Sequence, residues 1–121
     1  MRLKWLDRGA CLLLVLFSAG HAFIGTLMTR PWTDTGTLWS FSGSLAAWMI
    51  AALNWLRSGR PDDKALAFWS LVGAVAWIFL MIWLMEVARM WGDPRPWLFI
   101  LVCLVLSAFA VYGLSRRAAT A

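Results

Sequence analysis

Three ionisable side chains stand inside apolar runs of the sequence: His21, Glu86 and Arg89. Ionisable groups at membrane depth are costly and usually face the interior of a helix bundle. An imidazole and a carboxylate at similar depth could share a proton, hold a polar headgroup or relay protons to a substrate. We therefore take these three residues as a candidate ligand-binding site, and we expect Trp39 and Trp83 to lie beside them.

The positions of His21 and Glu86 along their apolar runs place the two side chains at comparable depths in the membrane. His21 comes nine residues before Arg30, or about 13 Å from that end of its run at the rise of an α-helix. Glu86 comes six residues before Gly92, or about 9 Å from the same side. A simpler interpretation stays open. Glu86 and Arg89 stand three residues apart and can pair with each other, and His21 can hydrogen-bond a serine or a carbonyl.

The elements that carry these residues are four apolar stretches, each close to the roughly 20 helical residues that cross a bilayer. Of the 121 residues, 62% are hydrophobic and 14% are charged, and a soluble domain of this length cannot bury so much apolar surface. Short links force neighbouring helices to run antiparallel. We expect an all-α, polytopic membrane protein: one domain over residues 1–121, forming an antiparallel up-down four-helix transmembrane bundle with helices at about 9–29, 38–56, 65–89 and 97–115.

The links between the stretches carry helix-capping chemistry. Residues 33–35 offer N-caps for the second helix, and the carboxylates of Asp62 and Asp63 stand before the third. Gly92 is followed by Pro94, as expected for a C-cap glycine and a residue that cannot continue a helix. These signals predict where each helix begins and ends.

The distribution of basic residues predicts the orientation of the chain. Lysines and arginines concentrate in the segments that would share one side of the membrane, and this asymmetry marks the cytoplasmic side. We expect both termini in the cytoplasm of a bacterial inner membrane. A cleaved signal peptide is the alternative for the first stretch, although its apolar run is long enough to span. The sequence has eight such residues on one side, Arg2, Lys4, Arg8, Arg57, Arg60, Lys64, Arg116 and Arg117, and three on the other, Arg30, Arg89 and Arg95.

The numbers and positions of certain residue types exclude several kinds of site. One histidine cannot supply a bis-histidine haem or a histidine-rich zinc site, and Cys11 and Cys103 are expected at different depths. The basic residues lie at the ends of apolar runs, so no stripe remains for nucleic acid. No glycine-rich phosphate loop or hydrolase motif is present in the sequence. We expect no metal and no cofactor, and the protein is more consistent with a non-enzyme than with an enzyme.

Small residues and tryptophans indicate how the helices meet. Small residues recur every four positions in the second stretch and form two flat ridges that let a neighbouring backbone approach closely. Such faces could also receive a partner protein or a second copy of the chain. Most of the ten tryptophans fall at the predicted interfaces, whereas Trp48, Trp77 and Trp83 lie deeper, where each indole N–H needs a partner. The ridges are Gly36, Ser40 and Ser44 on one side and Gly43, Ala47 and Ala51 on the other.

The run Gly20-His21-Ala22-Phe23-Ile24-Gly25 carries a family resemblance. With it, the chain resembles small uncharacterised bacterial inner-membrane proteins that have four spans and a Gly-His pair in the first. Its layout is more distantly similar to the DoxX-like families and to the four-span sterol isomerase and sigma-2 receptor group. Those relatives imply an apolar cavity between the helices.

Two function classes follow from these observations. The first is a non-enzymatic accessory or assembly protein that packs against partner helices. The second is a binder, carrier or enzyme for a lipid-like molecule, using a pocket near His21 and Glu86. A small ion or drug transporter is a minor alternative, because the size resembles that of small multidrug exporters although the first stretch lacks their acidic residue. Membrane lipids are expected partners in every case.

Overall fold

The computed structural model describes residues 2–116 and is all-α over that range. It contains four helices that are long and apolar enough to cross a membrane, as the sequence predicts. The first continues from an α-helix into a π-helix, and no strand occurs in the described range. The elements are α1 (Arg2–Ala19), η1 (Gly20–Leu27), α2 (Thr35–Gly59), α3 (Lys64–Val87) and α4 (Pro94–Ser115).

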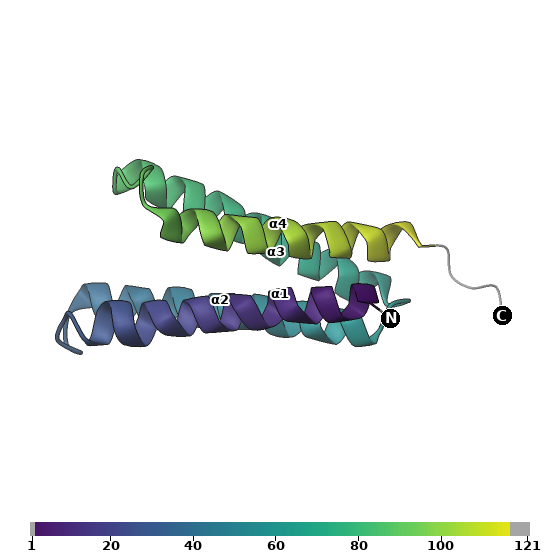
Figure 1. The fold of residues 1–121 in the computed structure, drawn as a ribbon, viewed down its shortest axis with the longest axis horizontal. Helices are drawn as coiled ribbons and strands as arrows, with labels where there is room; N and C mark the ends of the chain where they lie inside the picture. The colour runs from purple at the N-terminus through teal and green to yellow at the C-terminus, as the bar shows by residue number, and fades with distance from the viewer. Residues whose placement is uncertain (1, 117–121) are drawn as a thin grey trace.

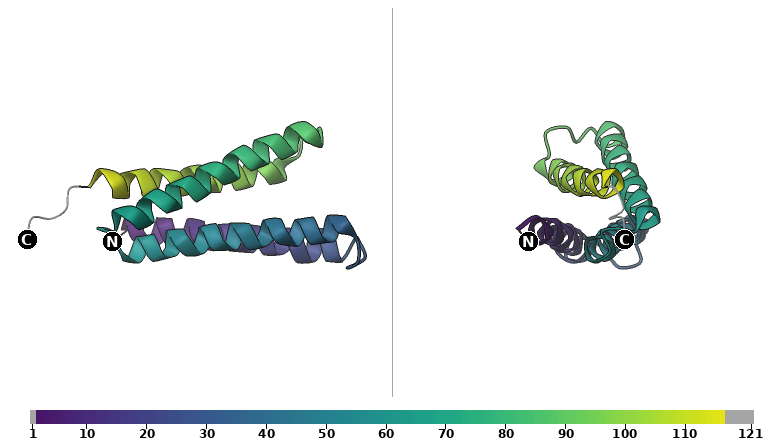
Figure 2. Two further views of the ribbon diagram at one scale, coloured as in Figure 1. Left: turned by 180° about the vertical axis from the view of Figure 1, so that it is seen from behind. Right: turned by 90° about the vertical axis from the view of Figure 1, so that its right-hand side faces the viewer.

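The helices form two antiparallel hairpins, one of α1, η1 and α2 and the other of α3 and α4 (Figure 1). In the bundle, α1 contacts α2 and α4, and α2 contacts α3, so α1 and α3 are diagonal and do not touch. We call the end with the start of α1 and the end of α4 the terminal end, and the opposite end the turn end. The hairpins diverge toward the turn end, where η1 packs only on α1 and α2 (Figure 2).

The helix boundaries differ from those expected. The first helix begins at Arg2 rather than near residue 9, and α2 and α4 begin at Thr35 and Pro94, three residues early. Apolar runs mark the part of a helix that suits hydrocarbon, whereas backbone hydrogen bonding continues into polar residues beyond it. Arg117, which was counted among the basic residues of the terminal end, lies outside the described residues.

Of the predicted caps, Asp63 is confirmed, and Asp93, which was not predicted, caps α4. Asp63 Oδ1 accepts a hydrogen bond from the backbone N–H of Leu66 at 2.9 Å, at the start of α3. Asp93 Oδ1 accepts one from the backbone N–H of Arg95 at 2.9 Å, at the start of α4. Asp34 occupies the N-cap position of α2, but its side chain caps no N–H and instead pairs with Arg30. Carboxylates therefore precede all three later helices, and two of them satisfy a free backbone donor.

The C-terminal signal of α3 was assigned to the wrong residue. The helix ends at Val87, and Arg89 rather than Gly92 adopts the left-handed conformation, with φ of 54°. The N–H of Arg89 donates to the carbonyl of Glu86 at 3.4 Å, and the N–H of Met90 donates to that of Met85 at 2.9 Å. This pair of bonds defines a Schellman motif, whose left-handed position usually holds glycine. The motif therefore carries the steric cost of a Cβ at Arg89.

The small-residue ridges of α2 pack inside the protein. Ser44 is buried and donates to the backbone carbonyl of Ser18 at 2.9 Å, so α1 and α2 approach closely. Ala47 is fully buried, and a Cβ added at Gly43 would lie 3.7 Å from the ring of Trp77 on α3. The predicted packing face is therefore confirmed, and its contacts are within the chain.

Candidate functional site

A cleft of about 500 Å³ lies between the two hairpins and reaches the turn end of the bundle. Residues from η1 and all four helices line it, because the hairpins diverge there. Its volume is within the range of pockets that hold small organic ligands. The lining divides into a polar part, which includes His21, Thr26, Ser40, Arg30 and Arg95, and an apolar part, which includes Trp77, Leu80, Met81, Leu84 and Phe99.

The π-helix η1 positions the polar part of the cleft. In a π-helix the backbone hydrogen bonds join residues five apart, and such segments occur frequently at functional sites. Thr26 Oγ1 donates to the carbonyl of His21, five residues earlier, at 3.0 Å. The same hydroxyl lies 2.7 Å from Ser40 Oγ on α2. The bond to Ser40 holds η1 against α2, and His21, Gly25 and Thr26 all line the cleft.

Basic side chains supply the charge of the cleft lining. Arg30 pairs with Asp34 at 3.3 Å, and Arg95 pairs with Asp93, but neither carboxylate lines the cleft. Hydrogen bonds from the side chain and backbone of Arg95 hold the pKa of Asp93 at about 2, and the positive charge of Arg95 acts in the same direction. The ionised Asp93 thus fixes Arg95 beside the cleft. Together with His21, the two arginines make the polar lining suited to an anionic or neutral polar group.

Trp77, one of the apolar lining residues, contains a buried polar atom without a partner in the described part of the chain. Trp77 is only 6% exposed, and its indole Nε1 has no hydrogen-bond acceptor within residues 2–116. Its ring packs edge-on against Phe99, with ring centroids 6.3 Å apart. A buried N–H without an acceptor is destabilising by about 1–3 kcal/mol, and such groups are uncommon in folded proteins. By contrast, Trp48 Nε1 donates to the carbonyl of Val15 at 3.4 Å.

The structure brings together only some of the predicted site residues. His21 and Trp39 line the cleft, whereas Glu86, Arg89 and Trp83 do not. Trp83 is 68% exposed, and Glu86 is exposed and accepts a hydrogen bond from Trp91 Nε1 at 3.0 Å. Within residues 2–116, no ion pair joins Glu86 to Arg89. The structure therefore gives no support to a site shared by His21 and Glu86.

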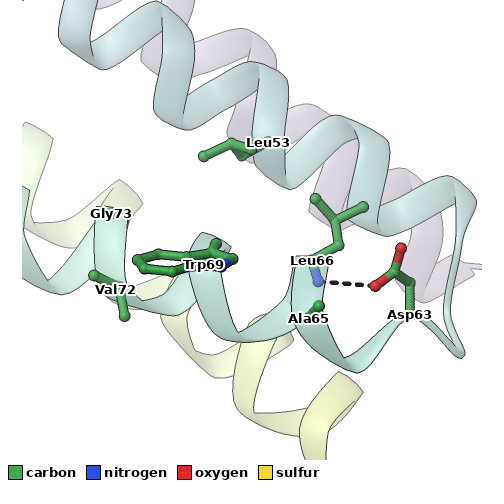
Figure 3. A pocket seen from close by; sticks show the side chains of 7 residues that line it. All are labelled: Leu53, Asp63, Ala65, Leu66, Trp69, Val72 and Gly73. Carbon is green, nitrogen blue, oxygen red and sulfur yellow. Dashed lines mark hydrogen bonds between the residues drawn. The ribbon is translucent and has the colours of Figure 1, made fainter.

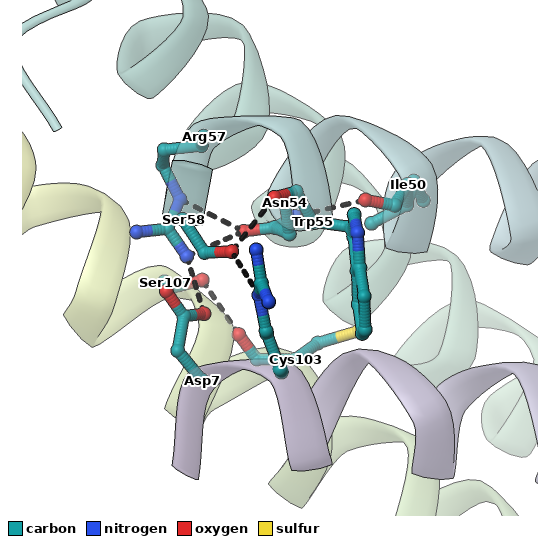
Figure 4. A network of polar contacts seen from close by, with 9 residues as sticks. Asp7, Ile50, Asn54, Trp55, Arg57, Ser58, Cys103 and Ser107 are labelled. Carbon is teal, nitrogen blue, oxygen red and sulfur yellow. Dashed lines mark hydrogen bonds and ion pairs between the residues drawn. The ribbon is translucent and has the colours of Figure 1, made fainter. Parts of the chain in front are cut away.

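A second polar cluster, at the terminal end, was not anticipated. Asp7 on α1 and Arg57 on α2 form a buried ion pair, with 2.6 Å between Oδ1 and Nη2 (Figure 4). Asn54 is fully buried and its Oδ1 accepts from Arg57 Nε at 3.3 Å and from Nη2 at 3.2 Å. In the same cluster, Arg8 Nε donates to Ser58 Oγ at 3.2 Å. The signal was present in α2, because Asn54 and Arg57 continue the spacing of the buried ridge that includes Ala47 and Ile50.

The described residues hold no cluster of three metal-ligating His, Cys, Asp or Glu side chains. Cys11 and Cys103 are buried free thiols. No family model matches the chain, and neither a curated protein nor a solved structure matches it. The assignment of function therefore depends on the cleft itself.

Proposed function

We propose that the protein is a non-enzymatic membrane protein that binds a lipid-like amphipathic molecule in the cleft between its hairpins. The polar head would lie at the turn end beside His21 and Arg95, and the apolar chain would extend along Trp77, Leu80 and Phe99. An amphipathic ligand suits this arrangement because one part of the lining is basic and the other is apolar. This division of one cleft into a basic part and an apolar part is the single observation that carries the proposal.

We further propose that the chain spans a bacterial inner membrane four times with both termini in the cytoplasm. The excess of lysine and arginine at the terminal end supports this orientation. In that orientation the cleft opens on the side of the membrane away from the cytoplasm. A reporter enzyme that is active only after export, fused behind Ala121, should stay inactive. An active fusion would show that the chain has the opposite orientation.

Binding can be tested with oleate, which combines an apolar chain with a carboxylate head. Oleate is titrated into delipidated protein in a non-ionic detergent, and complexes are counted by native mass spectrometry. Gly43→Leu should abolish binding because its side chain would grow into the cleft beside Trp77. Gly9→Leu is the matched control, since a Cβ at Gly9 meets no atom within 4 Å and the residue lies away from the cleft.

Arg95→Gln in the same titration tests the placement of the head. It removes one cation from the cleft and should weaken oleate binding by about fivefold, the effect of roughly 1 kcal/mol. If Gly43→Leu binds oleate as the unaltered protein does, the cleft is not the binding site and the proposal fails.

An accessory protein that packs on partner helices is the second candidate. One observation favours it: an open apolar pocket between α2 and α3, lined by Leu53, Leu66, Trp69 and Val72 (Figure 3). Asp63 lies at its edge, where it caps α3. A photo-crosslinker at Leu53 that captures one helical membrane protein in cells, while the oleate experiment fails, would support this candidate instead.

A further inference from the structure

Arg57 presents an unused donor at the terminal end of the bundle. The residue is only 5% exposed, and its Nε and Nη2 are engaged by Asp7 and Asn54. Its Nη1 makes no hydrogen bond within the part of the chain that the structure describes. A guanidinium carries five N–H donors in a planar fork, so the two on Nη1 are available to a ligand. The ion pair with Asp7 holds that nitrogen in a fixed position.

A third cavity, of about 330 Å³, has Arg57 in its lining. Its lining contains three basic side chains, Lys4, Arg57 and Arg116, and one acidic side chain, Asp7. Three positive charges minus one negative charge leave a formal excess of two. Lys4 and Arg116 are exposed, and the Arg116 guanidinium is 5.8 Å from the centre of the Tyr112 ring. The cavity is therefore electropositive, with one buried donor side chain and two exposed ones.

The position of the cavity matches that of a lipid headgroup. It is formed where α1 begins and α2 and α4 end, and Leu3, Phe109 and Tyr112 provide apolar walls. Basic pockets between membrane helices on the cytoplasmic side bind the headgroups of anionic lipids. The phosphate of a phospholipid offers several oxygens to the Arg57 guanidinium and to Lys4. The acyl chains of the same lipid would then lie along the apolar helix surface.

We propose that this cavity binds the phosphate of an anionic phospholipid, with Arg57 Nη1, Lys4 and Arg116 as its ligands. This second site is at the opposite end of the bundle from the cleft. It rests on the proposed orientation of the chain in the membrane but not on the function proposed for the cleft. Arg57 is both part of the fold and part of the site, because Asp7 and Asn54 orient it. Variants at Lys4 and Arg116 are therefore the appropriate test.

The experiment follows the thermal midpoint of the full chain in a non-ionic detergent during a titration with phosphatidylglycerol. A ligand that binds only the folded state raises the midpoint with its concentration. Lys4→Gln and Arg116→Gln should each raise the concentration needed for half of the shift by about fivefold, from roughly 1 kcal/mol per basic residue. Arg60→Gln is the matched control, because it removes the same charge from the neighbouring loop but does not line the cavity.

Parallel titrations identify the source of the phosphate. A shift with phosphatidylglycerol but not with sodium phosphate supports a lipid, whereas equal shifts would support free phosphate bound by the same residues. No shift with either probe would overturn the proposal. An equal shift with phosphatidylcholine, or an Arg60→Gln effect as large as that of Arg116→Gln, would also overturn it.

Discussion

The buried pair of Asp7 and Arg57 makes a strong prediction about stability. Both side chains are 6% exposed, and the contact between Oδ1 and Nη2 is 2.6 Å. Asp7→Asn keeps the shape but leaves a buried guanidinium without its counter-ion. Breaking a buried pair on one side typically costs about 3–5 kcal/mol. Asn54 remains as an acceptor for Arg57, so we expect a loss near the lower limit, about 3 kcal/mol.

The matched control is the exposed pair of Arg30 and Asp34, whose side chains are 59% and 39% exposed. Asp34→Asn should cost at most about 1 kcal/mol, because water and salt screen exposed ion pairs. The free energy of unfolding is measured for each variant by titration with sodium dodecyl sulfate in mixed micelles, followed by circular dichroism. Helix content measured before the titration checks that each variant has folded.

A double variant tests whether the loss of stability comes from leaving one buried charge without its counter-ion. Asp7→Leu with Arg57→Met replaces both charges by apolar groups, which is often neutral for a buried pair. The double variant should therefore be more stable than Asp7→Asn alone. If Asp7→Asn costs no more than Asp34→Asn, or if the double variant loses more stability than Asp7→Asn, the reasoning about this ion pair is refuted.

Three further predictions concern other parts of the fold. Ser44→Leu should destabilise the protein more than Leu45→Phe in the same titration, because Ser44 is buried against α1 whereas Leu45 is 56% exposed; equal losses would contradict this. Arg89→Gly should stabilise by up to about 1 kcal/mol because the left-handed backbone favours glycine, and Arg89→Ala should not. Hydrogen bonds from Arg95 depress the pKa of Asp93 from 3.8 to about 2, so its carboxylate stabilises the fold above pH 3.8 and that contribution is lost as the pH falls toward 2. Asp93→Asn should remove this acid-dependent part of the loss in thermal midpoint, and an unchanged pH profile would contradict it.

The sequence predicts the architecture well because hydrophobicity and capping are local properties. The four apolar helices and the carboxylate cap Asp63 follow from composition and from residues within one helical turn. The prediction that Gly92 forms the C-cap of α3 is wrong. The preference for glycine is a tendency, and in this chain the Schellman bonds form two residues after α3 ends, at Arg89.

The candidate site depends on how separate helices face one another, and this was only partly predictable. His21 and Trp39 line the same cleft, but Glu86, although expected at a similar depth, does not line it and accepts a hydrogen bond from Trp91 instead. Depth along a helix follows from counting residues, whereas direction around the helix depends on the packing of the hairpins. The π-helix that holds His21 also changes the register of the first helix and could not be inferred from periodicity.

The division into two hairpins has a consequence for the order in which the protein is made. Each hairpin joins helices that are adjacent in the chain, and the pairs α1 with α2 and α3 with α4 make most of the contacts between helices. Contacts between near neighbours in sequence form readily, so the first hairpin can assemble while the ribosome is still translating the second. The contact between α1 and α4 joins helices that are far apart in the sequence and must wait until α4 has been made. The cleft is therefore absent from the nascent chain until α4 has been made, so ligand binding would begin only after α4 has joined the first hairpin.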